Sequence, residues 1–126
     1  MKQVLLFIWQ LPQDIIGLTV ILVTKAVYCN KGCWVTAQGR FGVSLGDYII
    51  LGQVVNNTDL KHEQGHQKQS LYLGPSYLLL VGLPSVLGNI WDRLFHKKWS
   101  DAEREKWYYS RYPENWADKL GDVKRF

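Results

Sequence analysis

Two long apolar stretches flank a mixed central region in the pattern of hydrophobic and polar positions. The first stretch, 3–28, begins with Val4–Trp9, passes through Pro12 and Asp14, and becomes apolar again over 15–23. A bilayer-spanning helix needs about 20 consecutive apolar residues, and this run is interrupted at its middle. We predict a membrane-embedded or membrane-associated helical segment, with two short helices joined near Pro12. An unusually apolar core helix is the alternative.

The region from Cys33 to Val55 is rich in aromatic and β-branched residues and is interrupted by glycines. This pattern predicts a short β-hairpin or small meander. We expect these strands to lie beside the helix that follows, where an edge strand can receive an extended peptide by strand addition. Strands that only cover the helix are the alternative.

A helix is predicted after these strands, ending near Leu71. Asn57 or Thr58 can cap its first N–H groups, and Asp59 suits the positive end of the helix dipole. The Gly74–Pro75 pair then provides a stop signal. Most of the second apolar stretch follows this pair.

The second apolar stretch, 71–91, contains no charged residue, so on length alone it is a transmembrane candidate. Pro75 and Pro84 divide it into pieces shorter than a bilayer is thick. We therefore predict a broken helix that is a buried core element, a re-entrant segment or an interfacial one, and not a full crossing.

After Trp91 the chain becomes polar and basic. Ser100 and Glu103 have the spacing of a capping box, which predicts a short helix from about Asp101. His96 lies among positive charges and aromatic residues, and we expect it at the surface or in an interface.

Composition adds limits to this outline. The 126 residues suffice for one domain with a modest core, and the net charge of +4 comes from Lys and Arg spread along the chain. That distribution argues against nucleic-acid binding and fits anionic lipid. Cys29 and Cys33 can form a disulfide across a tight turn or remain thiols, and we favour thiols.

Residues His62-Glu63-Gln64-Gly65-His66 form an H-E-x-x-H sequence. Histidines four apart on a helix are offset by roughly 40° around its axis, so His62 and His66 can bind one ion. Glu63 can take a proton from a metal-bound water. The alternative is a solvated helix face that carries two histidines and a glutamate.

A third ligand is expected downstream, on a helix of about two turns between Pro113 and Gly121. Glu114 and Asp118 lie four apart on one face of that helix. If Glu114 binds the metal, Asp118 can accept the free ring N–H of a zinc histidine and fix its tautomer. The alternative is a Glu114 favoured by the helix dipole and an Asp118 paired with a lysine.

The combination of H-E-x-x-H with the E-x-x-A-D sequence from Glu114 to Asp118 resembles the gluzincin pattern of zinc metallopeptidases. This resemblance implies Zn²⁺ as cofactor, with His62, His66 and Glu114 as ligands, Glu63 as general base and Asp118 as the residue that orients a histidine. It also implies an α+β fold, with a small zincin-like domain whose strands lie beside the metal-binding helix.

The longer stretches 62–70 with 73–75, and 112–121, also resemble small uncharacterised, membrane-associated bacterial proteins. We therefore divide the chain into an apolar membrane-associated segment, 1–28, and a zincin-like metal-binding domain, 29–126. The resemblance covers the C-terminal half, and the short chain with its apolar N-terminus departs from large soluble gluzincins. The side of the membrane is left open.

We predict a zinc-dependent metallopeptidase that hydrolyses a peptide or protein substrate, with Glu63 as general base and a metal-activated water. A tyrosine hydroxyl is expected to stabilise the oxyanion, with three candidates: Tyr108, Tyr109 and Tyr112. The alternative is a non-catalytic membrane-associated protein with a polar core network or a structural metal site. In such a site, the fourth ligand is one of three residues: Cys29, Cys33 or His96.

Overall fold

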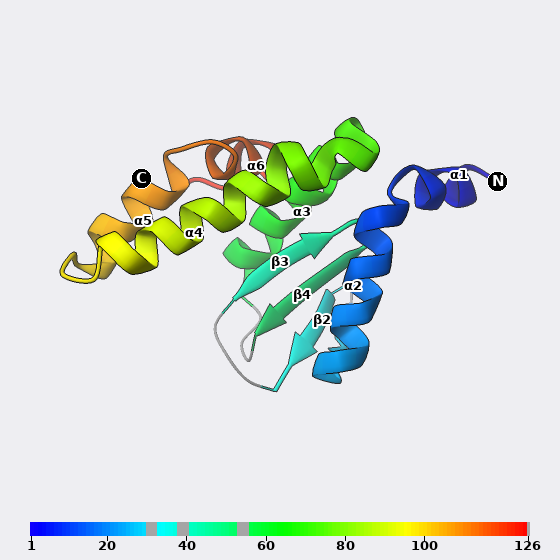
Figure 1. The fold of residues 1–126 in the computed structure, drawn as a ribbon, viewed down its shortest axis with the longest axis horizontal. Coiled ribbons are helices and arrows are strands. Elements are labelled where there is room, and N and C mark those ends of the chain that lie inside the picture. The colour runs from blue at the N-terminus through cyan, green and yellow to red at the C-terminus, as the bar shows by residue number, and fades with distance from the viewer. Residues whose placement is uncertain (30–32, 38–40, 53–55, 126) are drawn as a thin grey trace.

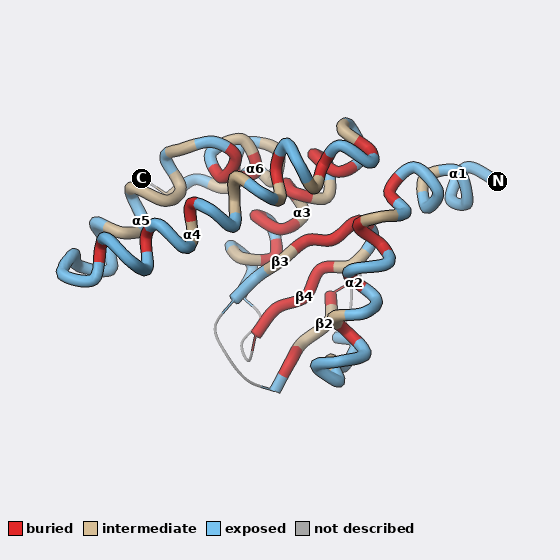
Figure 2. The backbone as a smooth tube through the Cα atoms, in the orientation of Figure 1, coloured by how far each residue is buried: buried red, intermediate tan, exposed pale blue. Residues whose placement is uncertain are grey.

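The computed structural model describes residues 1–29, 33–37, 41–52 and 56–125. Within these ranges, six α-helices and two short helical turns accompany a four-stranded sheet, which confirms the predicted α+β class. Helix α2 packs on one face of the sheet and α3 on the other, while α4, α5 and α6 lie beyond the β3 edge (Figure 1). Figure 2 shows that buried residues gather along the sheet and α3, while α1 is largely exposed.

The N-terminal apolar segment forms α1, Lys2–Trp9, and α2, Leu11–Thr24, which meet at an angle of 84°. Pro12 lies in the first turn of α2, so the prediction of two short helices joined near this proline is confirmed. Helix α2 packs closely on the sheet at Gly17, where a Cβ would lie 3.0 Å from the Cβ of Leu45. Asp14 is fully buried against the β3–β4 turn, where its Oδ1 accepts from the Asp47 N–H.

The sheet consists of β1 Val27–Tyr28, β2 Cys33–Thr36, β3 Gly42–Leu45 and β4 Tyr48–Gly52, in the order β1-β2-β4-β3. The hairpin prediction is confirmed for β3 and β4, which pair antiparallel, but a meander is wrong because β4 lies between β2 and β3. The central strand is apolar on both faces, with residues 49–51 at most 1% exposed, whereas β3 carries Ser44 and takes the edge.

Helix α3, Asn57–Leu73, ends before Gly74, as the sequence predicts. Its cap differs from the prediction, because Asn56 accepts the Asp59 N–H at 3.1 Å. Asp59 is the third residue of the helix, so this contact makes Asn56 the N-cap of a helix that starts at Asn57. Ile49 and Leu51 of β4 form the core together with Leu60 of α3.

The second apolar stretch forms a 3₁₀ turn, η1 Gly74–Ser76, a π-helical turn, η2 Leu78–Gly82, and α4, Leu83–Phe95. A break at Pro84 is a wrong prediction, since the chain stays helical from residue 78 to 95. Pro84 has no N–H for the Leu80 carbonyl four residues earlier, and the hydroxyl of Tyr112 donates to that carbonyl instead. An outside donor thus lets the helix continue.

The remaining helices are α5, Asp101–Tyr109, and α6, Glu114–Leu120. The capping box between Ser100 and Glu103 is present, so this predicted start is confirmed. His96 is 6% exposed, which corrects its prediction as a surface or interface residue. Its ring stacks on that of Trp99 with 3.7 Å between ring centroids, and its Nδ1 lies 2.9 Å from Asp92 Oδ1.

The two cysteines are free thiols, as favoured from the sequence. Cys33 is buried in the core cluster beneath α3, while Cys29 is exposed. The backbone N–H of Cys29 donates to the carbonyl of Cys33 at 2.9 Å, which holds the two strands together at this point.

Candidate metal centre

Two histidines of α3 and a glutamate of α6 converge at the centre of the molecule. Glu114 Oε2 lies 2.9 Å from His62 Nε2 and 3.0 Å from His66 Nε2, and all three side chains are buried. Their candidate ligand atoms lie within 4.8 Å of one another. In the described ranges, no other group of three or more His, Cys, Asp or Glu residues meets this condition, so Cys29, Cys33 and His96 belong to no such group.

Glycines allow α3 and α6 to approach closely enough for this convergence. A Cβ on Gly65 would lie 1.9 Å from the carbonyl oxygen of Ala117, and one on Gly121 would lie 2.0 Å from that of Lys61. Any larger residue at either position would push the two backbones apart, because these neighbours are backbone atoms. The glycine inside the H-E-x-x-H sequence therefore determines where Glu114 sits.

The outer nitrogen of each histidine ring has its own partner. His62 Nδ1 lies 2.6 Å from Asp118 Oδ1, and His66 Nδ1 lies 2.6 Å from Gln69 Oε1. The Gln69 amide orientation is fixed because its Nε2 donates to the carbonyl of Pro113 at 3.2 Å. Both partners are acceptors, so both Nδ1 atoms carry a proton.

This arrangement leaves both Nε2 atoms directed at Glu114. A neutral ring that is protonated on Nδ1 has a lone pair on Nε2, and an ionised carboxylate offers only lone pairs. Three acceptors at these distances repel unless protons on the rings or a cation between them supplies positive charge. The site is thus built for positive charge at its centre.

The pKa values reflect the same imbalance. Burial lowers the pKa of His62, but hydrogen bonds to Asp118 and Glu114 outweigh it and raise that pKa to about 9. Burial raises the pKa of Glu114, and the two histidines more than offset this and hold it well below its usual range. Without a cation, two buried groups therefore carry opposite charges.

The donor set also fits a metal. Two imidazole nitrogens and one carboxylate, with a fourth position open, are the ligands of catalytic zinc sites. Ligand atoms around tetrahedral zinc lie roughly 3.3 Å apart, and the two carboxylate-to-imidazole distances are 2.9 and 3.0 Å. If the three side chains moved apart by a few tenths of an ångström, their ligand atoms would have the spacing found around zinc. The present distances are those of charged hydrogen bonds.

Glu63 lies beside this cluster and lines a cavity of about 850 Å³ between α4 and the edge strand β3. Its side chain is buried, and its Oε2 has no hydrogen-bond partner within the described part of the chain. Burial raises the pKa of Glu63, and the charges of His66 and His62 act in the opposite direction. A Cβ on Gly42 would lie 2.7 Å from Glu63 Oε1, so the strand passes directly over this carboxylate.

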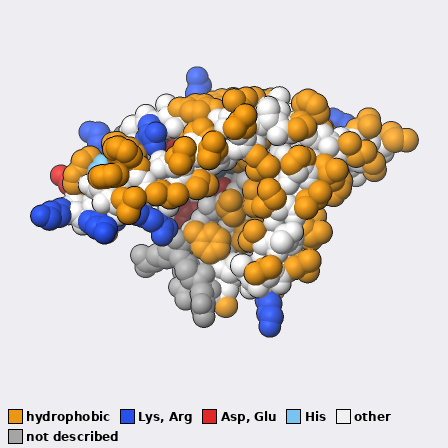
Figure 3. Space-filling view, in the orientation of Figure 1, with side chains coloured by type: hydrophobic (Ala, Val, Ile, Leu, Met, Phe, Trp, Pro, Cys, Tyr) orange, Lys and Arg blue, Asp and Glu red, His pale blue; other side chains and the backbone are white. Residues whose placement is uncertain are grey.

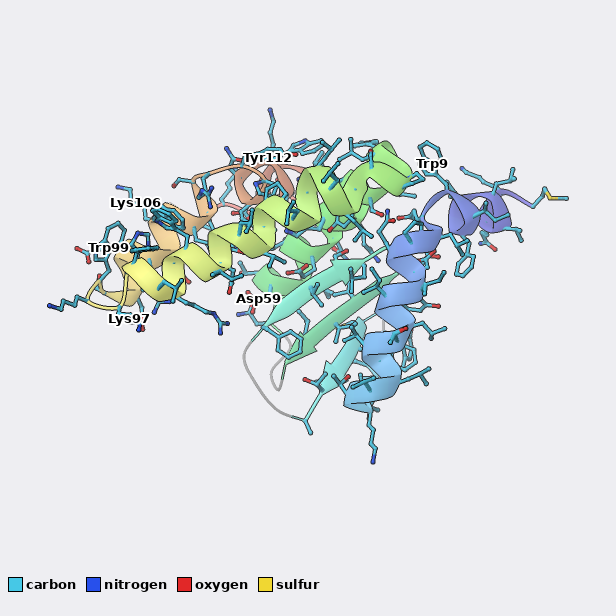
Figure 4. The ribbon with its side chains drawn as sticks, viewed as in Figure 1. Trp9, Asp59, Lys97, Trp99, Lys106 and Tyr112 are labelled. Carbon is cyan, nitrogen blue, oxygen red and sulfur yellow. The ribbon has the colours of Figure 1, made fainter. Side chains whose placement is uncertain are left out.

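The three candidate tyrosines have different positions. Tyr108 donates to Glu114 Oε1 at 3.1 Å, which places it on the candidate third ligand. Tyr109 lines the cavity, and its ring packs edge-on against His62 with 5.1 Å between centroids. Tyr112 lies beside α4 and makes the Leu80 contact described above, outside the cavity lining (Figure 4). Tyr112 is therefore not placed to contact a substrate in this cavity.

Three further residues of the site escaped sequence reasoning. The Ser85 hydroxyl of α4 donates to Glu114 Oε1, Gln69 orients His66, and Arg125 Nε donates to Asp118 Oδ2 at 2.7 Å. Only Gln69 carries a sequence signal, since it follows His66 by three residues on the same helix. Ser85 and Arg125 reach the site through tertiary packing.

Comparisons with known proteins do not add to this geometry. No protein-family model, curated protein or solved structure matches the chain.

Proposed function

We propose that the chain is a zinc-dependent metallopeptidase, with His62, His66 and Glu114 as zinc ligands. One observation carries the proposal: the Nε2 atoms of two histidines and one carboxylate oxygen converge on one point, beside a buried glutamate with an unused oxygen. A cation satisfies that point, and an open cavity lies next to it. Glu63 is the proposed general base.

The residues around the cavity suit peptide hydrolysis. Bound zinc supplies a Lewis acid that acidifies a water and polarises a peptide carbonyl. Glu63 takes the proton that water loses on attacking the carbonyl carbon, and delivers it to the amine as the C–N bond breaks. The Tyr109 hydroxyl, for which no hydrogen bond is found among the described residues, is the proposed oxyanion donor.

The edge strand is the proposed substrate guide. The Ser44 carbonyl faces away from β4, because it accepts from the Tyr77 hydroxyl at 3.0 Å. Backbone groups two residues apart on a strand point the same way, so Gly42 presents its N–H and C=O to the cavity side. An extended peptide paired there would lie over Glu63.

A second candidate is a non-catalytic core network in which protonated His62 and His66 pair with Glu114. The observation that favours it is the pair of distances of 2.9 and 3.0 Å, which are normal for such ion pairs. Zinc content separates the two candidates, because a metal site takes up stoichiometric zinc and an ion-pair network does not.

The experiment compares His62→Ala and Glu63→Gln with the wild-type chain by metal analysis and hydrolysis of a peptide library. We expect wild type to hold one zinc and cleave peptides, His62→Ala to lose both properties, and Glu63→Gln to keep zinc and lose cleavage. A wild-type protein that cannot be loaded with zinc would rule out the peptidase, and a zinc-loaded, active Glu63→Gln would rule out the general base.

A further inference from the structure

Large apolar side chains remain exposed along α1, α2 and α4. Within the described residues, one helical stretch, 78–95, is by itself long and apolar enough to cross a bilayer, and only 11% of it is buried. Leu22 and Val23 at the end of α2 are 71% and 76% exposed. Contiguous exposed apolar surface on this scale marks a binding face.

The outer surface of α4 continues directly from the cavity wall. Each residue advances about 100° around the axis, so Asn89 and Arg93, which line the cavity, lie near one direction. Leu87, Trp91 and other exposed apolar residues lie roughly 120° to 180° away from that direction. Between the two sets, Leu83 and Val86 line the cavity and are also 47% and 56% exposed. The apolar stripe thus begins inside the cavity mouth.

Charge is arranged around this apolar surface. In the stretches 1–28 and 71–95, the only carboxylates are Asp14 and Asp92, and both are buried. Exposed basic residues stand at the helix ends, at three places: Lys2, Lys25 and the pair Lys97 and Lys98. Figure 4 shows Trp9 and Trp99 near opposite ends of the molecule, and they are 46% and 42% exposed. Tryptophan and basic residues at the edge of an apolar surface are typical of membrane interfaces.

The cavity opens on the same face. In Figure 3, hydrophobic side chains cover the surface from α4 across to α2 and α1, with Lys and Arg around the edge. Acidic side chains appear in the hollow beneath α4 and at the far left edge. The hollow is lined by Glu63 and Asp59 among others.

We propose that the face formed by α1, α2 and α4 seats on an anionic lipid bilayer, with the cavity opening toward it. The substrate, a part of the inference that rests on the proposed peptidase function, is then a polypeptide segment in or emerging from that bilayer. Helix α4 lies along the surface and does not cross, because its opposite flank holds Ser85 against Glu114 and Arg93 at the cavity.

A lipid surface fits this face better than a second copy of the chain. Two copies joined through this face would bring their basic helix ends together, in a protein of net charge +4. They would also cover both cavities. Anionic headgroups neutralise those basic ends, with about 1 kcal/mol typical for each Lys or Arg near such a surface.

The test is flotation of the full chain with vesicles of phosphatidylcholine, with and without phosphatidylglycerol. We expect binding that is stronger with phosphatidylglycerol, and a loss of about tenfold in Leu22→Glu and in Leu87→Glu. Ala102→Glu adds the same charge to exposed α5 and should bind as wild type. Circular dichroism checks that each variant is folded.

The contrary outcomes are equally definite. Absence of flotation overturns the proposal, as do equal binding to both vesicle types, equal binding by all variants, or a dimer that Leu87→Glu dissociates. Glu63→Gln should float as wild type. Flotation without zinc uptake would refute the peptidase alone, and cleavage of soluble peptides without flotation would refute the membrane face alone.

The substrate half is tested with one peptide sequence, either anchored in vesicles by a membrane-spanning segment or free in solution. Wild type should cleave the anchored form faster, and Leu87→Glu should lose that preference while it keeps its rate on the free peptide. Equal rates on the two forms by wild type would refute this substrate class.

Discussion

Replacing Gly65 with alanine should disable the metal centre without touching a ligand. The new Cβ would lie 1.9 Å from the Ala117 carbonyl oxygen, while a relaxed carbon-to-oxygen contact is about 3.3 Å. Helices α3 and α6 must therefore separate by roughly 1.4 Å. Metal–ligand distances tolerate about 0.2 Å, a 1 Å misplacement in an active site lowers the catalytic rate about 100-fold, and loss of a supporting contact weakens metal affinity about 10- to 100-fold.

We expect Gly65→Ala to weaken zinc binding by about 100-fold, and to lower stability by about 1–3 kcal/mol through overpacking. Competition with a chromophoric chelator measures the first, and urea unfolding measures the second. The matched control is Gly82→Ala, whose Cβ would meet its nearest neighbour at 3.7 Å and should bind zinc as wild type. Zinc binding by Gly65→Ala at wild-type strength would show that the glycine contact does not position Glu114.

Three further changes test single contacts. Gln69→Leu removes the acceptor for His66 Nδ1 and should weaken zinc binding about 10- to 100-fold in the same competition assay. Tyr112→Phe leaves the Leu80 carbonyl without its donor and should cost about 1 kcal/mol in urea unfolding, with zinc content unchanged. Burial raises the pKa of Asp14 from 3.8 to about 6, so the folded state binds the extra proton, and the contribution of Asp14 to stability should fall as pH rises through this interval. Asp14→Asn should lack that fall.

Each change has a control that makes the same substitution at a different position. Gln67→Leu on the same helix should keep zinc affinity, Tyr72→Phe at an exposed site should keep stability, and Asp101→Asn should keep the pH slope. The reasoning fails wherever a control behaves like its partner. It fails for Asp14 also if the stability of wild type relative to Asp14→Asn does not fall between pH 4 and 6.

Local signals in the sequence predicted the features that depend on neighbours along the chain. The capping box at Ser100, the stop at Gly74 and the helix between Pro113 and Gly121 arise within a few residues. The meeting of the H-E-x-x-H helix with Glu114 was also expected, because the residue types and spacings matched a known pattern.

Features that depend on tertiary packing could not be predicted in the same way. The strand order follows from which strand can be buried on both faces, and that comparison needs the covering helices α2 and α3. Continuity through Pro84 depends on Tyr112, which is distant in sequence. His96 is buried because Trp99 and Trp107 cover its ring, although its sequence neighbours are basic.

The hydroxyl contact between Ser85 and Glu114 links the outer helix to the candidate metal centre. Together with the Tyr112 contact to the Leu80 carbonyl, it ties η2 and α4 to the segment that carries the third ligand. A displacement of this helix would therefore alter the coordination geometry. With cobalt(II) in place of zinc, that change would alter the visible absorption spectrum, because cobalt absorption depends on ligand geometry. The spectrum of the cobalt protein could then report, in real time, when α4 meets a lipid surface.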